Sequence, residues 1–145
     1  MRWLAIVVLV ACGKSAAPAP DAMTALCTDS APLAPTFANM QKVFASICTE
    51  CHIAGVELDL APSVSYASLV GVTAPSYANP PTDESCGGVL VVPGNPAASY
   101  LYLKLTTPPC AGSQMPLTEL GMSFSLPACE LTLVHDWIAA GAPND

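Results

Sequence analysis

The stretch from Phe37 to His52 reads FANMQKVFASICTECH and combines a helical pattern with two cysteines and a histidine. Large apolar side chains recur along it at helical spacing and therefore share one face of a helix. These residues are Phe37, Met40, Phe44 and Ile47. Pro35 and Thr36 precede the pattern as start signals. The stretch predicts a helix over residues 36–47 that leads directly into Cys48.

The predicted helix runs into Cys48-Thr-Glu-Cys-His52, which has the C-x-x-C-H spacing of covalent haem attachment. Two thiols three positions apart can reach the two vinyl groups on one edge of a porphyrin and form thioethers. The histidine that follows is then held beneath the iron. We therefore expect Cys48 and Cys51 to attach one haem c and His52 to be an axial ligand of its iron.

Three other interpretations of the C-x-x-C motif fit this sequence less well. A thioredoxin-like dithiol opens a helix after a buried strand, whereas this pair closes a helix. A zinc site needs a second pair of ligands at similar spacing, which His135 and the remaining cysteines do not supply. A plain disulfide between Cys48 and Cys51 leaves His52 without a role.

A methionine is the best candidate for the sixth iron ligand. Met115 lies in Gln114-Met115-Pro116, 63 residues after His52, and the proline stiffens the loop around it. A histidine and methionine pair raises the reduction potential and suits an electron carrier. Met122 is the rival in the same loop. Of the remaining donors, Met40 is expected in the core, Met23 in the N-terminal segment and His135 at the surface.

The N-terminus is typical of an exported lipoprotein. Arg2 precedes an apolar run, and Leu9-Val-Ala-Cys12 resembles a lipobox whose cysteine receives the lipid. The apolar run is too short to span a bilayer. We expect a signal peptide over residues 1–11 and a flexible tether over residues 12–34, with one domain over residues 35–145. An ordinary secreted protein is the alternative for the N-terminus.

Composition and charge narrow the function classes. Aromatic residues make up 6% of the chain, so a buried prosthetic group would add apolar bulk that a short chain lacks. Without Arg2 the chain keeps three lysines against eleven carboxylates, a net charge of −8. Such an acidic surface argues against nucleic acid as a partner. It favours redox partners with a basic docking surface and a salt-dependent encounter.

The rest of the chain predicts short helices separated by long loops. We expect a short helix near residues 65–70 and an extended run over residues 89–92. A second long helix should begin at Asn95 as N-cap and Pro96 as first residue, and continue through Leu105. A last helix should cover residues 128–140, with Leu131, Val134, Trp137 and Ile138 facing inward. No internal repeat is visible, and only one haem-type motif occurs.

These pieces together resemble a class I monohaem cytochrome c, in the style of the cytochrome c-like lipoproteins of planctomycetes and myxobacteria. The resemblance rests on residues 44–52, 92–101, 115–116 and 135–143, and it covers about residues 36–143. Gly55 also matches the family's C-H-x-x-G pattern. The resemblance implies an all-α fold, with small helices around one haem and long loops. Its first and last helices are expected to cross beside a haem crevice, with His52 and Met115 as axial ligands. The long segment 53–92 departs from the family's pattern.

Four cysteines remain once Cys12 and the motif pair are set aside: Cys27, Cys86, Cys110 and Cys129. An even number in an oxidising compartment predicts two disulfides, for which three pairings are possible. We favour Cys27–Cys129, which ties the end of the tether to the last helix, together with Cys86–Cys110, which clamps the chain ahead of Met115. A Cys110–Cys129 pairing stays open.

The leading functional hypothesis is a lipid-anchored, single-electron carrier of the cell envelope, with no side chain doing bond chemistry, and hence not an enzyme. Three alternatives stay open. The chain is an electron-entry subunit of a redox enzyme complex, or a haem-binding sensor that lacks a firm sixth ligand. Without haem, it is a disulfide-rich binding lipoprotein.

Overall fold

A computed structural model of the chain describes residues 25–56, 58–74, 88–106, 113–118 and 120–145. Within these ranges the protein is helical, and the only β pairing is in isolated bridges, such as those between Val70 and Val91 and between Thr73 and Val89. The expectation of a helical protein without a sheet is confirmed for these ranges. The expected positions Cys12, Cys86 and Cys110 lie outside them, as does Met23.

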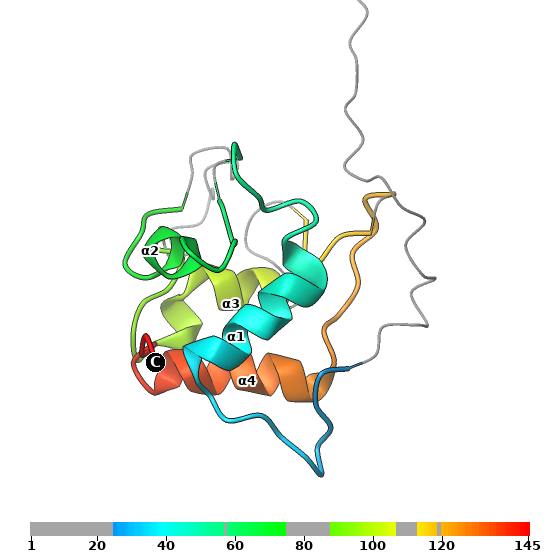
Figure 1. The fold of residues 1–145 in the computed structure, drawn as a ribbon, viewed down its shortest axis with the longest axis vertical. Coiled ribbons are helices and arrows are strands. Elements are labelled where there is room, and N and C mark those ends of the chain that lie inside the picture. The colour runs from blue at the N-terminus through cyan, green and yellow to red at the C-terminus, as the bar shows by residue number, and fades with distance from the viewer. Residues whose placement is uncertain (1–24, 57, 75–87, 107–112, 119) are drawn as a thin grey trace, which may run out of the picture.

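Helices α1, α3 and α4 form the packed body of the structure, with the short α2 beside them (Figure 1). Helix α4 packs against both α1 and α3. The elements in chain order are α1 (Phe37–Val43), the π-helical turn η2 (Phe44–Cys48), α2 (Ser65–Leu69), the 3-10 turn η3 (Pro96–Ala98), α3 (Tyr100–Leu105) and α4 (Ala128–Ala139). No helix in the described part of the chain has the length and apolar character of a membrane span.

Helix α1 begins where the sequence predicted it, but its last turn changes register. The hydroxyl of Thr36 accepts a hydrogen bond from the amide of Asn39 and caps the helix. After Val43 the chain widens into η2, in which the amide of Thr49 donates to the carbonyl of Phe44 at 3.0 Å. Such π-turns are rare and often occur at functional sites. Here the π-turn delivers Cys48 as its last residue.

The helix predicted from Asn95 to Leu105 is interrupted at Ser99. Asn95 caps η3 as expected, because its side chain accepts from the amide of Ala98 at 3.1 Å. Ser99 is fully buried in an extended conformation, and its hydroxyl donates to the carbonyl of Asn95 at 2.8 Å. Its oxygen also accepts from the amide of Val92 at 2.9 Å. A serine that bonds nearby backbone groups in this way competes with the helical pattern, so α3 begins only after it.

The core lies between α1 and α4. Trp137 is completely buried, and its ring centroid lies 5.7 Å from that of Phe37. The inward face predicted for the helix over residues 36–47 is buried except for Ile47 in η2, which is partly exposed, and Val43 joins that face. On α4 the sequence placed Leu131 inward, but Leu133 is buried instead and Leu131 is only partly covered. The buried face of α4 is therefore turned toward Leu133, because Cys129 and Glu130 also point inward from its first turn.

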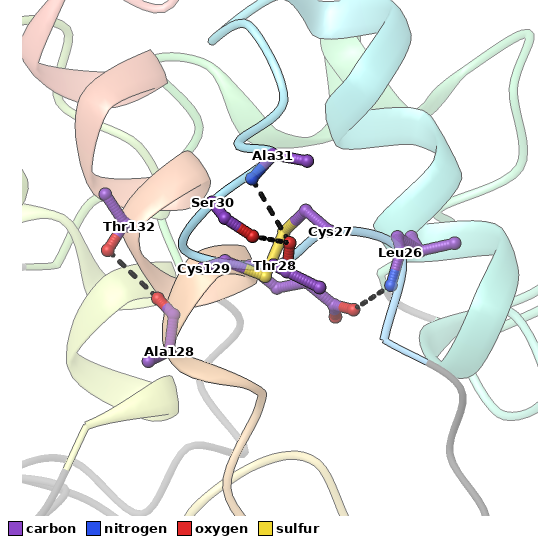
Figure 2. The surroundings of a disulfide bond; sticks show 9 residues. Leu26, Cys27, Thr28, Ser30, Ala31, Ala128, Cys129 and Thr132 are labelled. Carbon is purple, nitrogen blue, oxygen red and sulfur yellow. Dashed lines mark hydrogen bonds between the residues drawn. A yellow bond between two sulfur atoms is a disulfide. The ribbon is translucent and has the colours of Figure 1, made fainter.

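The segment ahead of α1 is fastened to the first turn of α4, as Figure 2 shows. A disulfide joins Cys27 to Cys129, with their Cα atoms 6.0 Å apart, which is the pairing that the sequence favoured. The amide of Leu26 donates to a carboxylate oxygen of Glu130 at 2.8 Å. A short turn follows, in which the amide of Ala31 donates to the hydroxyl of Thr28. We call residues 25–33 the strap.

Loss of the disulfide should destabilise the domain without changing its helices. The bond joins residues 102 positions apart, and a loop of this length is expected to contribute about 4 kcal/mol through restriction of the unfolded chain. The C27A/C129A variant should therefore show that loss in guanidinium unfolding. A single C27A change should do the same, because it removes the same bond. Equal stability of the variants and the parent chain would contradict the pairing.

Candidate functional site

The Cys48–His52 motif lies at the turn where η2 ends. The amide of His52 donates to the carbonyl of Cys48 at 2.9 Å, which keeps the five residues in one tight turn. Both cysteines of the motif are thiols in this structure. Cys48 is mostly covered and packs against the core, whereas Cys51 is exposed. The predicted helix thus brings the three motif residues together, but it presents the two sulfur atoms to different surroundings.

The ring of His52 is held from one side by the loop that follows it. Its Nδ1 lies 3.3 Å from the carbonyl oxygen of Leu58. Because a carbonyl only accepts, Nδ1 carries the proton in this contact, and Nε2 is then the unprotonated nitrogen of the neutral ring. The main-chain oxygen of His52 accepts from the amide of Leu60 at 3.0 Å. The ring and the backbone of His52 are therefore both fastened to residues 58–60.

Burial keeps the imidazole of His52 neutral. It lowers the pKa of His52 below its ordinary value, and the hydrogen bond to Leu58 opposes this only in part. A neutral imidazole with an unprotonated Nε2 is the form that binds metals. A hydrogen bond from the other ring nitrogen to a backbone carbonyl is also the arrangement that orients histidine ligands in metal sites.

Cys48 sits beside a buried acidic group. Burial first, then the negative charge of Glu130 and then Cys51, raise the pKa of the Cys48 thiol to about 12. Glu130 comes from the first turn of α4 and is 1% exposed. One of its carboxylate oxygens accepts from the strap, and the other, Oε2, has no hydrogen-bond partner within the described ranges. Glu130 lies at the N-terminal end of α4, where the helix dipole favours a negative charge.

The two motif thiols should react at very different rates before any cofactor is attached. The thiolate is the nucleophile, and at neutral pH the raised pKa of Cys48 leaves little of it. Iodoacetamide should therefore modify exposed Cys51 roughly tenfold or more faster than Cys48 in the haem-free chain. Peptide mass spectrometry over time measures both rates. The Cys48 rate should keep rising with pH up to about 12, because below its pKa the thiolate fraction grows about tenfold for each pH unit.

A Glu130→Gln variant separates the effect of burial on the pKa of Cys48 from the effect of the Glu130 charge. Burial is the larger cause, so removal of the carboxylate should accelerate Cys48 alkylation modestly and leave Cys51 unchanged. Equal rates for the two cysteines in the parent chain, or faster reaction at Cys48, would contradict the assigned surroundings.

Met115 lies in a loop that is fastened to the end of α3. Its amide donates to the carbonyl of Lys104 at 2.7 Å. The side chain of Gln114 donates to the carbonyl of Leu105, and the ammonium of Lys104 donates to the carbonyl of Ser113 at 2.7 Å. The Met115 side chain is partly buried and packs against the same core as Cys48. The structure thus places a thioether and one thiol of the motif on the same core.

The other methionines behave differently from Met115. Met122 is 55% exposed, in a turn where the amide of Thr118 donates to its carbonyl at 2.8 Å. Gly121 has φ +74°, a backbone conformation that favours glycine, and it closes this turn. Met40 is completely buried in α1, as the sequence predicted. Among the three methionines that the structure describes, Met115 is therefore the one that is neither locked in the core nor turned to solvent.

His135 is at the surface, as expected. Its side chain is 47% exposed and its Nδ1 lies 2.8 Å from a carboxylate oxygen of Asp136. Its ring contacts the edge of Tyr102, with centroids 5.5 Å apart. The described residues contain no group of three or more histidine, cysteine, aspartate or glutamate side chains that would hold a metal ion.

Several residues of this site had no signal in the sequence. Leu58 is an unremarkable loop leucine that acts through its carbonyl. Glu130 reads as an ordinary acidic residue in a first helical turn. Only the approach of the strap and of Cys48 makes Glu130 a buried neighbour of the motif.

Comparisons of the chain with models of known protein families, with curated proteins and with solved structures gave no match.

Proposed function

We propose that the chain is an exported single-electron carrier that holds one haem c on the thiols of Cys48 and Cys51. The observation that carries the proposal is the state of His52. Its Nδ1 is held by the Leu58 carbonyl, so the neutral ring keeps Nε2 for a metal. This ring directly follows two cysteines that are thiols, although the described chain also contains a disulfide.

The residues present suit a covalently attached haem better than a chelated ion. The motif offers two thiols for thioether bonds and one imidazole, and the Met115 loop offers a thioether, which is a soft ligand. Bound there, a haem would supply an iron centre that gains and loses one electron. The class I cytochrome c fold that the sequence resembles belongs to this proposal. In it, His52 and Met115 would hold the iron.

The chain's own groups would then prepare the site for electron transfer. The Leu58 carbonyl orients His52 and makes its ring more basic. The hydrogen bonds from Gln114 and Lys104 hold the loop of Met115 on α3. No side chain is required to make or break a bond during electron transfer. The negative charge of the chain would favour a basic redox partner over nucleic acid.

Expression of the full chain together with the c-type haem attachment machinery tests the proposal. The purified protein should keep its haem absorption after denaturation in acid and organic solvent, because thioether bonds survive that treatment. Complete loss of colour on denaturation would overturn the proposal. A chain that never takes up haem would instead favour the disulfide-rich binding lipoprotein.

Attachment to a membrane is a further part of the proposal. It rests on the sequence Leu9-Val-Ala-Cys12, which lies outside the described residues. Cys12→Ser should release the protein from the membrane fraction into the soluble envelope fraction, because one residue would carry the whole anchor. Fractionation followed by immunoblotting measures the change. Membrane retention of the variant would contradict lipidation at Cys12.

A further inference from the structure

The loop that holds His52 is itself held by a side-chain network. Gln41 projects from α1, and its amide nitrogen donates to the carbonyl of Leu60 at 2.9 Å. The side-chain oxygen of Gln41 accepts from the hydroxyl of Ser65 at 2.5 Å. Ser65 is the first residue of α2 and is completely buried. One glutamine therefore connects two helices with the loop between them.

The network acts on the residues that fasten His52. The amide of Leu60 donates to the carbonyl of His52, and Leu58, two residues earlier, supplies the acceptor for its Nδ1. The Leu60 side chain is 2% exposed and packs in the core, so residue 60 has little freedom to move. Leu58 is only partly buried and packs at the edge of the core. Its carbonyl position therefore depends on the anchorage of residue 60.

We propose that Gln41 is a positioning residue for His52, and that it sets the ring tautomer by anchoring the Leu58–Leu60 loop from α1. Ser65 fixes the rotamer of Gln41 by donating to its oxygen, which leaves the amide nitrogen directed at Leu60. A glutamine whose side-chain oxygen and nitrogen are both bonded in this way cannot move without breaking a partly buried hydrogen bond. That Gln41 positions an iron ligand rests on the proposed function. That Gln41 sets the tautomer of His52 does not depend on the proposed function.

The tautomer of His52 can be measured without haem. The full chain with C48A and C51A cannot attach haem, and nitrogen-15 NMR distinguishes a ring protonated at Nδ1 from one protonated at Nε2. At a pH where the ring is neutral, this background should show the Nδ1–H form of His52. Gln41→Ala should convert it to the tautomer mixture of an exposed histidine, with loss of the Nδ1–H signal. Retention of that signal in the glutamine variant would overturn the proposal.

Two further variants test the same role of Gln41 if Gln41→Ala fails to fold. Gln41→Glu keeps an acceptor for Ser65 but has no donor for the Leu60 carbonyl, so it should also lose the Nδ1–H signal. Ser65→Ala removes only the support of Gln41 and should give a partial loss. Asn39→Ala is the matched control, because that amide on the same helix donates to Ala34 at 2.9 Å, away from the motif. It should retain the signal, and its loss there would show a general loosening of α1.

The reduction potential of the haem-loaded protein is the second readout. Weaker bonding at Nδ1 makes the imidazole a poorer electron donor to iron, so Gln41→Ala should raise the potential relative to the parent and to Asn39→Ala. If no variant attaches haem, the proposed function fails while the tautomer result stands. If haem attaches and the tautomer is unchanged by Gln41→Ala, the positioning role fails while the proposed function stands.

Discussion

The C48S/C51S variant is expected to lose covalent haem completely. Thioether bonds need both the sulfur atoms and the spacing that the turn after η2 gives them, and serine hydroxyls do not replace thiols in this chemistry. Made with the haem attachment machinery, the variant should show no haem mass by intact-protein mass spectrometry and no haem absorption after denaturation. The single C48S and C51S variants should each attach haem through one remaining bond, at reduced yield.

The matched control for this experiment is C27S/C129S, which also removes two cysteines. The disulfide that it breaks fastens the strap to α4 and is not part of the motif. This control should keep covalent haem while it loses stability. If the control lost haem and the motif variant kept it, the attachment sites would have to be reassigned. Covalent haem that persists in the C48S/C51S variant would contradict the proposed function.

Met115→Ala is expected to remove the sixth ligand of the iron. The weak absorption band at the red end of the spectrum, which reports sulfur bonded to ferric iron, should disappear. The reduction potential should fall, because a methionine ligand raises it. The ferrous protein should also begin to bind carbon monoxide, since an axial position is opened. Visible spectra with and without carbon monoxide measure both effects.

Met122→Ala is the control for that substitution. Its side chain is 55% exposed and it shares the loop with Met115, so the change perturbs the same segment without touching the core. The red band should survive in this variant, and carbon monoxide should not bind. A band that persists in Met115→Ala but vanishes in Met122→Ala would transfer the ligand to Met122. Carbon monoxide binding by the parent protein would favour the ligand-sensor alternative.

Prediction from sequence worked best where a local pattern was strong. The start of α1 and the span of α4 followed from helical spacing and from start and stop residues. Phe37, Met40 and Phe44 are buried as predicted, because burial follows the helical period, whereas Ile47 is only partly buried. The Cys27–Cys129 bond also followed from the sequence, although a competing pairing stayed open there. Cys86 and Cys110, the second predicted pair, lie outside the described residues.

The two errors have different physical causes, one local in the chain and one tertiary. Ser99 interrupts the predicted helix because it is buried where it can bond the backbone at Val92 and Asn95. The face of α4 turns toward Leu133 because the strap draws Cys129 and Glu130 inward. The partners of Ser99 are only four and seven residues away in the chain, whereas the turned face of α4 has no local signal, because Cys27 lies 102 positions from Cys129.

The motif from Cys48 to His52 could be recognised from the sequence alone, because the proposed haem attachment needs those residue types at that spacing. The same holds for the helix that leads into it. The burial and the hydrogen bonds of the motif side chains, in contrast, depend on the tertiary structure. Burial beside Glu130 raises the pKa of Cys48, whereas Cys51 is exposed. Residues 58–60, anchored by Gln41, hold the ring of His52. Spacing is a property of neighbours in sequence, whereas burial, pKa and tautomer depend on groups that only the folded chain brings together.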